Sequence, residues 1–126
     1  MIDTVRLSES AKRRLTNLKR LTGIDQWNIL SRWALCVSLS EGSIPPAQDN
    51  ESMSSIEMTW KVFAGHHSDA YLAVVLNEYN EAKESGFELT ESEFVRLHIE
   101  RGIATLANKL RKNKLPALIE LGTKAA

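Results

Sequence analysis

The sequence is poor in cysteine and in long apolar segments, and each shortage excludes a class of protein. Among its 126 residues there is a single cysteine, Cys36, so the chain forms no internal disulfide and a reducing cytosol is its natural compartment. No apolar run approaches the roughly 20 residues that span a bilayer, and the first residues lack a signal-peptide pattern. We therefore expect a cytoplasmic protein that has no membrane partner.

The motifs of the common enzyme classes are also missing. There is no glycine-rich phosphate loop, no paired-histidine zinc motif and no nucleophile elbow. His66 and His67 are adjacent, so on a helix they would point in different directions, and no Cys/His cluster lies near them. We expect His98 to be a hydrogen-bonded interior or boundary residue and Cys36 to pack as a small hydrophobic residue. We predict a protein that is not an enzyme, has no catalytic residue and holds no metal or cofactor.

The formal net charge is zero, which by itself disfavours a nucleic-acid partner, but the charges are unevenly distributed. Residues 1–40 carry a net charge of +4, residues 41–100 a net charge of −9 and residues 101–126 a net charge of +5. Basic ends around an acidic middle suggest a polyanionic partner. The alternative is that the acidic middle neutralises the basic ends, within the fold or between subunits.

The N-terminal residues predict a short strand followed by an amphipathic helix. Residues 4–7 alternate polar and apolar, with Thr4 and Arg6 facing outward. Ser8 can cap the helix that follows, and Gly23 can end it in the left-handed conformation. One arc of this helix is apolar and the opposite arc is basic, with Arg14 at the boundary. The apolar arc comprises Ala11, Leu15, Leu18 and Leu21, and the basic arc comprises Lys12, Arg13, Lys19 and Arg20.

A second helix, predicted from a cap at Asp25 to about Ser40, is apolar almost all round. Such a helix must be buried on all sides, and the preceding strand and helix are too small to cover it. Either the rest of the chain or a second copy of it has to help. We expect an oligomer whose core includes Trp27, Leu30, Trp33, Ala34 and Val37.

A strand, a basic amphipathic helix and a buried helix, in this order, are typical of a ribbon-helix-helix unit, here spanning residues 1–42. In such units two chains pair their strands into a ribbon that fits the DNA major groove. Thr4 and Arg6 would then reach the bases, and Val5 and Leu7 would face inward. The alternative is an ordinary helical bundle in which Arg6 is merely solvated.

The remainder predicts a polar loop, a second strand and further helices. Residues 43–55 are polar and contain two adjacent prolines, and residues 56–62 then alternate apolar and polar as a strand does. One helix is predicted from Ser68 or Asp69 to near Gly86, and a capping box at Thr90 opens the last. We therefore predict a single domain over residues 1–126, mainly α with one or two short strands, with a ribbon-helix-helix-like N-terminal unit, C-terminal helices and an oligomeric state.

Basic residues crowd the C-terminal turns of the last helix. Favourable interaction with the helix dipole accounts for some of them, at roughly 0.3–1 kcal/mol per charge. Their number exceeds that need, so we predict a second phosphate-facing patch. It comprises Lys109, Arg111, Lys112 and Lys114.

Three stretches of the sequence resemble the DndE family, the small subunit of the bacterial DNA sulfur modification (phosphorothioation) system. They are residues 21–24 with 27–36, residues 57–63 with Gly65 and residues 69–71, and residues 94–98 with 101–103. The resemblance implies a non-catalytic subunit that acts with sulfur-transfer and ATPase subunits, forms tetramers and binds duplex DNA, with a preference for nicks. It also implies a bacterial cytoplasmic or nucleoid-associated location.

We therefore expect the chain to bind the double-stranded DNA backbone, through Arg6, the cations of the first helix including Arg14, and the C-terminal patch. Multiple Lys/Arg contacts to phosphates would make the affinity fall steeply with salt. One alternative is a sequence-specific ribbon-helix-helix transcriptional repressor or antitoxin. Another is an assembly scaffold that makes no contact with DNA.

Overall fold

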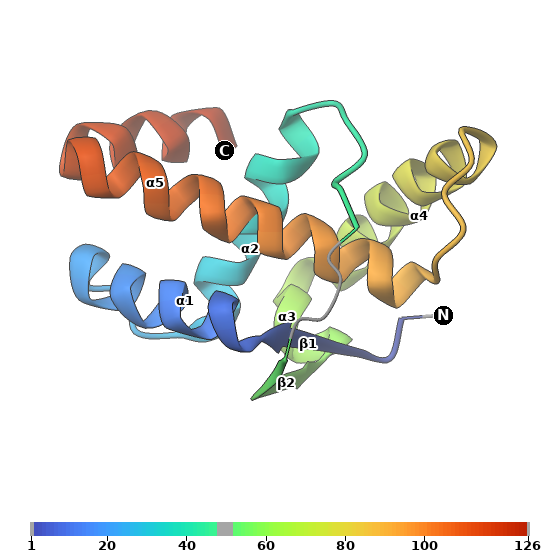
Figure 1. The fold of residues 1–126 in the computed structure, drawn as a ribbon, viewed down its shortest axis with the longest axis horizontal. Helices are drawn as coiled ribbons and strands as arrows, with labels where there is room; N and C mark the ends of the chain where they lie inside the picture. Colours follow the sequence, from blue (N-terminus) through green and yellow to red (C-terminus); the bar gives the residue numbers. More distant parts are fainter. Residues whose placement is uncertain (1, 48–51, 126) are drawn as a thin grey trace.

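The fold is organised around its longest helix, α5 (Glu91–Ala125), which crosses the molecule (Figure 1). The computed structural model describes residues 2–47 and 52–125, with side chains as far as Leu110. Two helices, α1 (Glu9–Thr22) and α2 (Trp27–Ser40), pack against α5. The chain continues through strand β2 (Met53–Thr59), helix α3 (Trp60–Ala64), the 3-10 turn η1 (Gly65–His67) and helix α4 (Ser68–Glu84). The predicted class, mainly α with two short strands, is confirmed.

The two strands form an antiparallel ribbon within one chain. Strand β1 (Thr4–Ser8) pairs with β2 so that Val5 lies opposite Met58 and Arg6 opposite Glu57, with a bulge before Ser8. Leu7 is buried and Arg6 is exposed, as the alternation predicts. A ribbon-helix-helix unit would pair β1 with the same strand of a second chain. That part of the prediction is not confirmed, because here β1 pairs with β2.

Helix α1 begins and ends where its capping residues predict. The Oγ of Ser8 accepts a hydrogen bond from the Ala11 N–H at 3.2 Å, which satisfies one of the free donors of the first turn. Gly23 adopts φ 75°, and its N–H donates to the Lys19 carbonyl. The cap predicted for α2 is wrong: Asp25 is exposed, and the cap position is Gln26, whose side chain makes no capping bond.

The second strand ends earlier than its alternation predicts. Strand β2 covers Met53–Thr59, so it begins inside the predicted polar loop, and Trp60 opens helix α3. The cause is local, because the Thr59 hydroxyl accepts a hydrogen bond from the Val62 N–H at 3.2 Å and so caps a helix. Trp60 and Phe63 are both buried, three residues apart on one helical face. Four alternating apolar residues within 56–62 are too few for the sequence to distinguish this helical spacing from that of a strand.

Helix α5 of the same chain covers much of α2. Leu30 and Ala34 are 1% and 0% exposed, and Val37 is buried as well. The two helices meet at Gly102, where an added Cβ would lie 1.8 Å from the Ala34 carbonyl oxygen, so no larger residue fits. These three α2 residues are thus covered without a second copy. Trp27 and Trp33 remain partly exposed on other sides of α2.

The last two helices start near their predicted positions. Helix α4 begins at Ser68, and neither Ser68 nor Asp69 provides a side-chain cap. Helix α5 begins after Thr90, whose hydroxyl accepts a hydrogen bond from the Glu93 N–H at 3.3 Å. Within the described residues, no helix combines the length and apolar character needed to cross a membrane. The same residues contain no group of three or more potential metal ligands.

Candidate nucleic-acid interface

Helix α1 divides its apolar and charged residues between two faces. Leu15 and Leu18 are completely buried against the rest of the fold, whereas Arg13 and Arg20 are exposed. We call the charged side the α1 basic face. It consists of Lys12, Arg13, Arg14, Lys19 and Arg20.

Three members of the α1 basic face have neutral neighbours. Lys12 Nζ donates a hydrogen bond to the Ser55 hydroxyl on β2 at 3.3 Å. Lys19 Nζ lies over the Trp27 ring, 4.0 Å from its centroid, in a cation–π contact. Arg20 donates to the Asn17 side-chain oxygen one turn earlier. These contacts fix the direction of the side chains without neutralising their charges.

Three acidic residues form ion pairs away from α1. Between described side chains, the ion pairs join Arg96 to Glu93 and Glu100, and Arg101 to Glu41. None of these pairs involves a cation of α1. Within the described residues, no acidic side chain therefore forms an ion pair with the α1 basic face.

The predicted C-terminal patch is described only at its first residue. Lys109 is exposed on α5. Helices α1 and α5 pack together and run toward the same end of the molecule (Figure 1). The side chains of Arg111, Lys112 and Lys114 lie outside the described residues.

Arg6 does not join the α1 basic face. Together with Thr4 it lines a depression of about 390 Å³ whose other wall contains Glu93 and Arg96 from α5. The outward face of β1 is therefore bordered by a helix and by a carboxylate. This setting differs from a free ribbon face whose side chains reach base edges.

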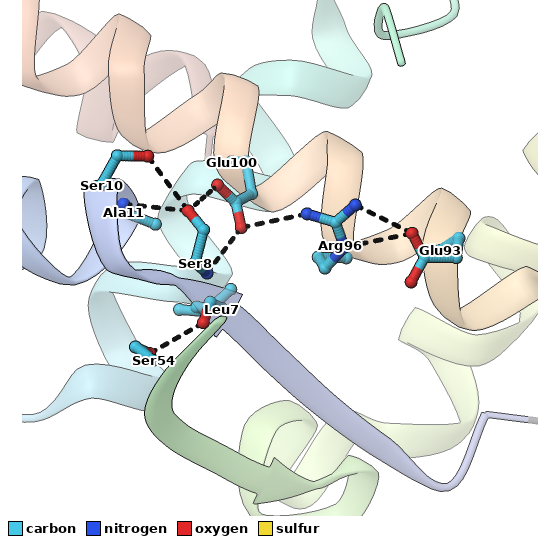
Figure 2. A network of polar contacts seen from close by, with 8 residues as sticks. All are labelled: Leu7, Ser8, Ser10, Ala11, Ser54, Glu93, Arg96 and Glu100. Atoms are coloured by element: carbon cyan, nitrogen blue, oxygen red, sulfur yellow. Dashed lines mark hydrogen bonds and ion pairs between the residues drawn. The ribbon is translucent and has the colours of Figure 1, made fainter. Parts of the chain in front are cut away.

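A buried polar network attaches the corner between β1 and α1 to α5 (Figure 2). The Glu100 carboxylate, 2% exposed, accepts hydrogen bonds from the Ser8 N–H at 2.8 Å and the Ser8 hydroxyl at 2.5 Å. On its other side it accepts a bond from Arg96 at 3.4 Å, and Arg96 also donates to Glu93 at 2.8 Å. Burial of Arg96 opposes its charge, but hydrogen bonds and charges of Glu93 and Glu100 outweigh burial and raise the pKa of Arg96. Glu100 is thus committed to the interior of the fold, whereas Glu93, whose side chain is 43% exposed, pairs with Arg96 from the surface.

A second buried cluster consists of a serine, a histidine and an arginine that come from α2 and α5. Ser38 Oγ lies 2.8 Å from His98 Nδ1, and Arg101 donates to the same hydroxyl at 2.8 Å. Ser38 and His98 are 0% and 3% exposed. Burial, followed by the charge of Arg101, lowers the pKa of His98 to about 4. His98 is the hydrogen-bonded interior residue that the sequence predicts.

Cys36 is also poorly suited to chemistry. It is half-buried on α2. Burial raises the pKa of its thiol, although a hydrogen bond with Tyr71 and the charge of Arg32 act in the opposite direction. Since the thiolate is the reactive form, this environment keeps the sulfur unreactive near neutral pH.

Sequence reasoning missed both buried clusters. The spacing of Glu93, Arg96 and Glu100 places them on one helical side, and this signal could have revealed an ion-pair row on α5. Nothing local predicts the bond from Ser8 to Glu100, because the two residues are 92 positions apart. The same is true of Ser38 and His98, which are 60 positions apart.

Comparisons with known proteins agree on one family. A family model described as "DNA sulphur modification protein DndE" matches residues 4–114. The crystal structure of DndE from Escherichia coli B7A, involved in DNA phosphorothioation modification, has a TM-score of 0.65 and 23% identity over 84% of this chain and 99% of that chain. A DndE glycine-to-lysine mutant involved in DNA phosphorothioation has a TM-score of 0.60 and 22% identity over 86% and 99%.

At these identities the two crystal structures establish a shared fold. A comparison with curated proteins gives no match. The family model, in contrast, extends over most of the sequence, from the first strand to the basic turns of α5. The chain therefore belongs to the DndE family of DNA sulphur modification proteins.

Proposed function

We propose that this chain is the non-catalytic DNA-binding subunit of a DNA phosphorothioation complex. The observation that carries the proposal is the α1 basic face, whose cations have no acidic partner among the described side chains. A rigid helix that presents several uncompensated cations matches the spaced negative charges of a duplex backbone. Lys109 adds a further exposed charge on α5, the helix that packs against α1.

The proposed mechanism is electrostatic. Each phosphate contact releases condensed counterions, so the affinity falls linearly with salt on a logarithmic scale, with a slope of about −0.9 per contact. Such contacts position a protein on DNA without reading its sequence. The sequence-specific repressor is less well supported, because β1 pairs with β2 of the same chain and Arg6 is bordered by Glu93.

A homo-oligomer, which we propose to be a tetramer, would multiply these contacts. Linked copies of a weak binding surface raise the overall affinity through a high effective concentration. The partly exposed Trp33 on α2 is a candidate for contact between copies. Family membership supports the other subunits of the modification complex as partners.

A non-catalytic role is supported by the state of the groups that most resemble catalysts. Ser38 and His98 are buried and hydrogen-bonded to each other, which disfavours their contact with a substrate. The raised pKa of Cys36 disfavours a thiolate that could carry sulfur. We propose that the sulfur chemistry is performed by partner subunits while this chain holds the DNA.

A preference for nicked duplex would follow from mechanics. A nick makes the duplex locally flexible, which lowers the cost of bending it onto a rigid protein surface. The prediction is a higher affinity for a nicked duplex than for an intact duplex of the same length and sequence. Equal affinities would remove this part of the proposal.

The test is a gel shift over a salt series with the purified protein and both duplexes. We expect the double variant Arg13→Glu/Arg20→Glu to bind both at least tenfold more weakly and with a shallower salt slope, because it loses two phosphate contacts and adds repulsion. The matched control is Lys61→Glu/Lys83→Glu, which makes the same charge change at two exposed lysines of α3 and α4. Equal losses in both variants would mean that only the net charge matters. Unchanged DNA retention with loss of subunit pairing would support the scaffold instead.

A further inference from the structure

An open cavity of about 600 Å³ lies between α1, the start of α2, strand β2 and α3. Its volume falls in the range of roughly 300–1,000 Å³ that is typical of small-molecule sites. Lys12 of the α1 basic face lines this cavity, so the cavity borders the surface that we propose holds the DNA backbone. Contacts between surface cations and DNA phosphates would not by themselves use this cavity.

The walls of the cavity carry the groups that recognise a nucleotide. Trp27 supplies an aromatic ring, and Gln26 and Asn28 supply side-chain amides from the adjoining positions. Base stacking on an aromatic side chain accepts any base, and amides pair with base edges. Lys19 lies over the Trp27 ring, so the ring is linked directly to the α1 basic face.

The cavity is lined by charges of both signs. Lys12 donates a hydrogen bond to Ser55 of β2, and the exposed carboxylates of Asp25 and Glu57 also line the cavity. Carboxylates would repel a bare phosphate, but they accept hydrogen bonds from the amino groups of bases. A ligand with an anionic part and an amino-bearing edge can interact with Lys12 and with a carboxylate at the same time.

We propose that this cavity receives one unstacked nucleotide of the bound DNA, with its phosphate at Lys12 and its base against Trp27. The inference rests on the proposed DNA-binding function and identifies what the same surface recognises beyond the backbone. A base beside a nick has lost the backbone continuity of one strand and is the least costly to unstack. The carboxylates of Asp25 and Glu57 favour bases that carry an amino group, namely cytosine, adenine and guanine, over thymine, which has none.

The test compares two nicked duplexes that differ at one position beside the nick, which carries either a base or an abasic sugar. We expect the unmodified protein to bind the abasic duplex about tenfold more weakly, because one stacking contact is lost. Val62, 56% exposed on the cavity wall, allows the cavity to be filled without disturbing the core. In Val62→Trp we expect the two duplexes to bind equally, because the base can no longer enter.

The matched control is Val74→Trp, since Val74 is a similarly exposed valine (51%) on α4 that is absent from the cavity wall. The Val74→Trp variant should still bind the abasic duplex about tenfold more weakly than the duplex that carries the base. A second pair of variants changes the stacking ring itself. Trp27→Ala should bind the two duplexes equally, whereas Trp27→Phe should still bind the abasic duplex more weakly, because phenylalanine can stack on a base. Circular dichroism of each variant confirms that it is folded.

The outcomes separate the two proposals. If the unmodified protein binds both nicked duplexes equally well and with a steep salt slope, the cavity inference is overturned and the proposed function stands. If Val62→Trp keeps the tenfold difference, the base does not enter this cavity and the inference is again overturned. The same holds if Val62→Trp instead prevents association with a partner subunit and leaves the base dependence intact. If neither duplex is bound, the proposed DNA-binding function itself fails.

Discussion

Helices α1 and α5 lie side by side and use their charged residues in opposite ways. On α1 the cations point away from the core and have neutral neighbours, as in the contact between Lys19 and Trp27. On α5, Arg96 and Glu100 are buried and bonded to each other. A buried charge must be paired to offset the loss of water, whereas an exposed charge needs no partner. The buried charges on α5 therefore support the fold, and the exposed charges on α1 are available for a ligand.

The largest effect on stability is expected when the buried carboxylate of Glu100 is removed. Glu100→Ala should reduce the free energy of unfolding by about 3 kcal/mol, because Ser8 loses its acceptor and Arg96 loses one buried partner. Urea denaturation measures the effect. Glu84→Ala, at an exposed acid of α4, is the control and should change stability by less than about 0.5 kcal/mol. A loss as small as that of the control would show that the network does not hold β1 and α1 on α5.

The pH dependence of folding tests the other buried group of α5. The pKa of His98 is about 4 in the fold, against 6.5 for an unperturbed histidine, so below pH 6.5 the unfolded chain binds a proton that the folded chain excludes. Stability therefore falls as the pH drops from 6.5 toward 4. Between pH 7.5 and pH 5.5 the native protein should lose about 1.4 kcal/mol more than His98→Gln, by proton linkage. Carboxylates are common to both proteins, so their effect cancels in the difference between the native protein and His98→Gln. Identical pH profiles of the two proteins would contradict the lowered pKa of His98.

A single exposed cation should have a smaller effect, and on binding alone. Lys109→Ala should weaken DNA binding a few-fold and reduce the salt slope by about one, with the same loss for every sequence. Its unfolding free energy should stay unchanged, because Lys109 is exposed. Gel shifts at several salt concentrations and urea denaturation of the same sample measure both quantities. A destabilised variant with an unchanged slope would assign Lys109 to the fold.

The smallest effect is expected at Cys36. Its half-buried thiol has a raised pKa, so we expect Cys36→Ala to leave DNA binding unchanged and sulfur incorporation intact when the complete modification system is supplied. Mass spectrometry of digested DNA measures the phosphorothioate content. Loss of phosphorothioate from a correctly folded variant would make Cys36 a participant in sulfur transfer and contradict the proposed non-catalytic role.

Local patterns predicted those parts of the fold that depend on neighbouring residues. The alternation of β1 and the caps of α1 at Ser8 and Gly23 are each decided within a few positions. The predicted end of β2 was wrong because the Thr59 hydroxyl caps a helix, and the alternating strand pattern is too short to reveal this. The sequence did not decide which element covers α2, because helix α5, which covers it, begins about fifty residues later along the chain.

The sequence by itself determined that one side of α1 is basic, because residues at helical spacing share a face wherever the helix is placed. Only the tertiary structure decided which charges remain available. Glu93 and Glu100 could have neutralised α1, but packing places them against Arg96 and Ser8 instead. The cavity beside Trp27 likewise exists only because α1, α2, β2 and α3 meet around it. Contacts between residues far apart in the chain depend on how all the elements pack together, and no local pattern records that arrangement.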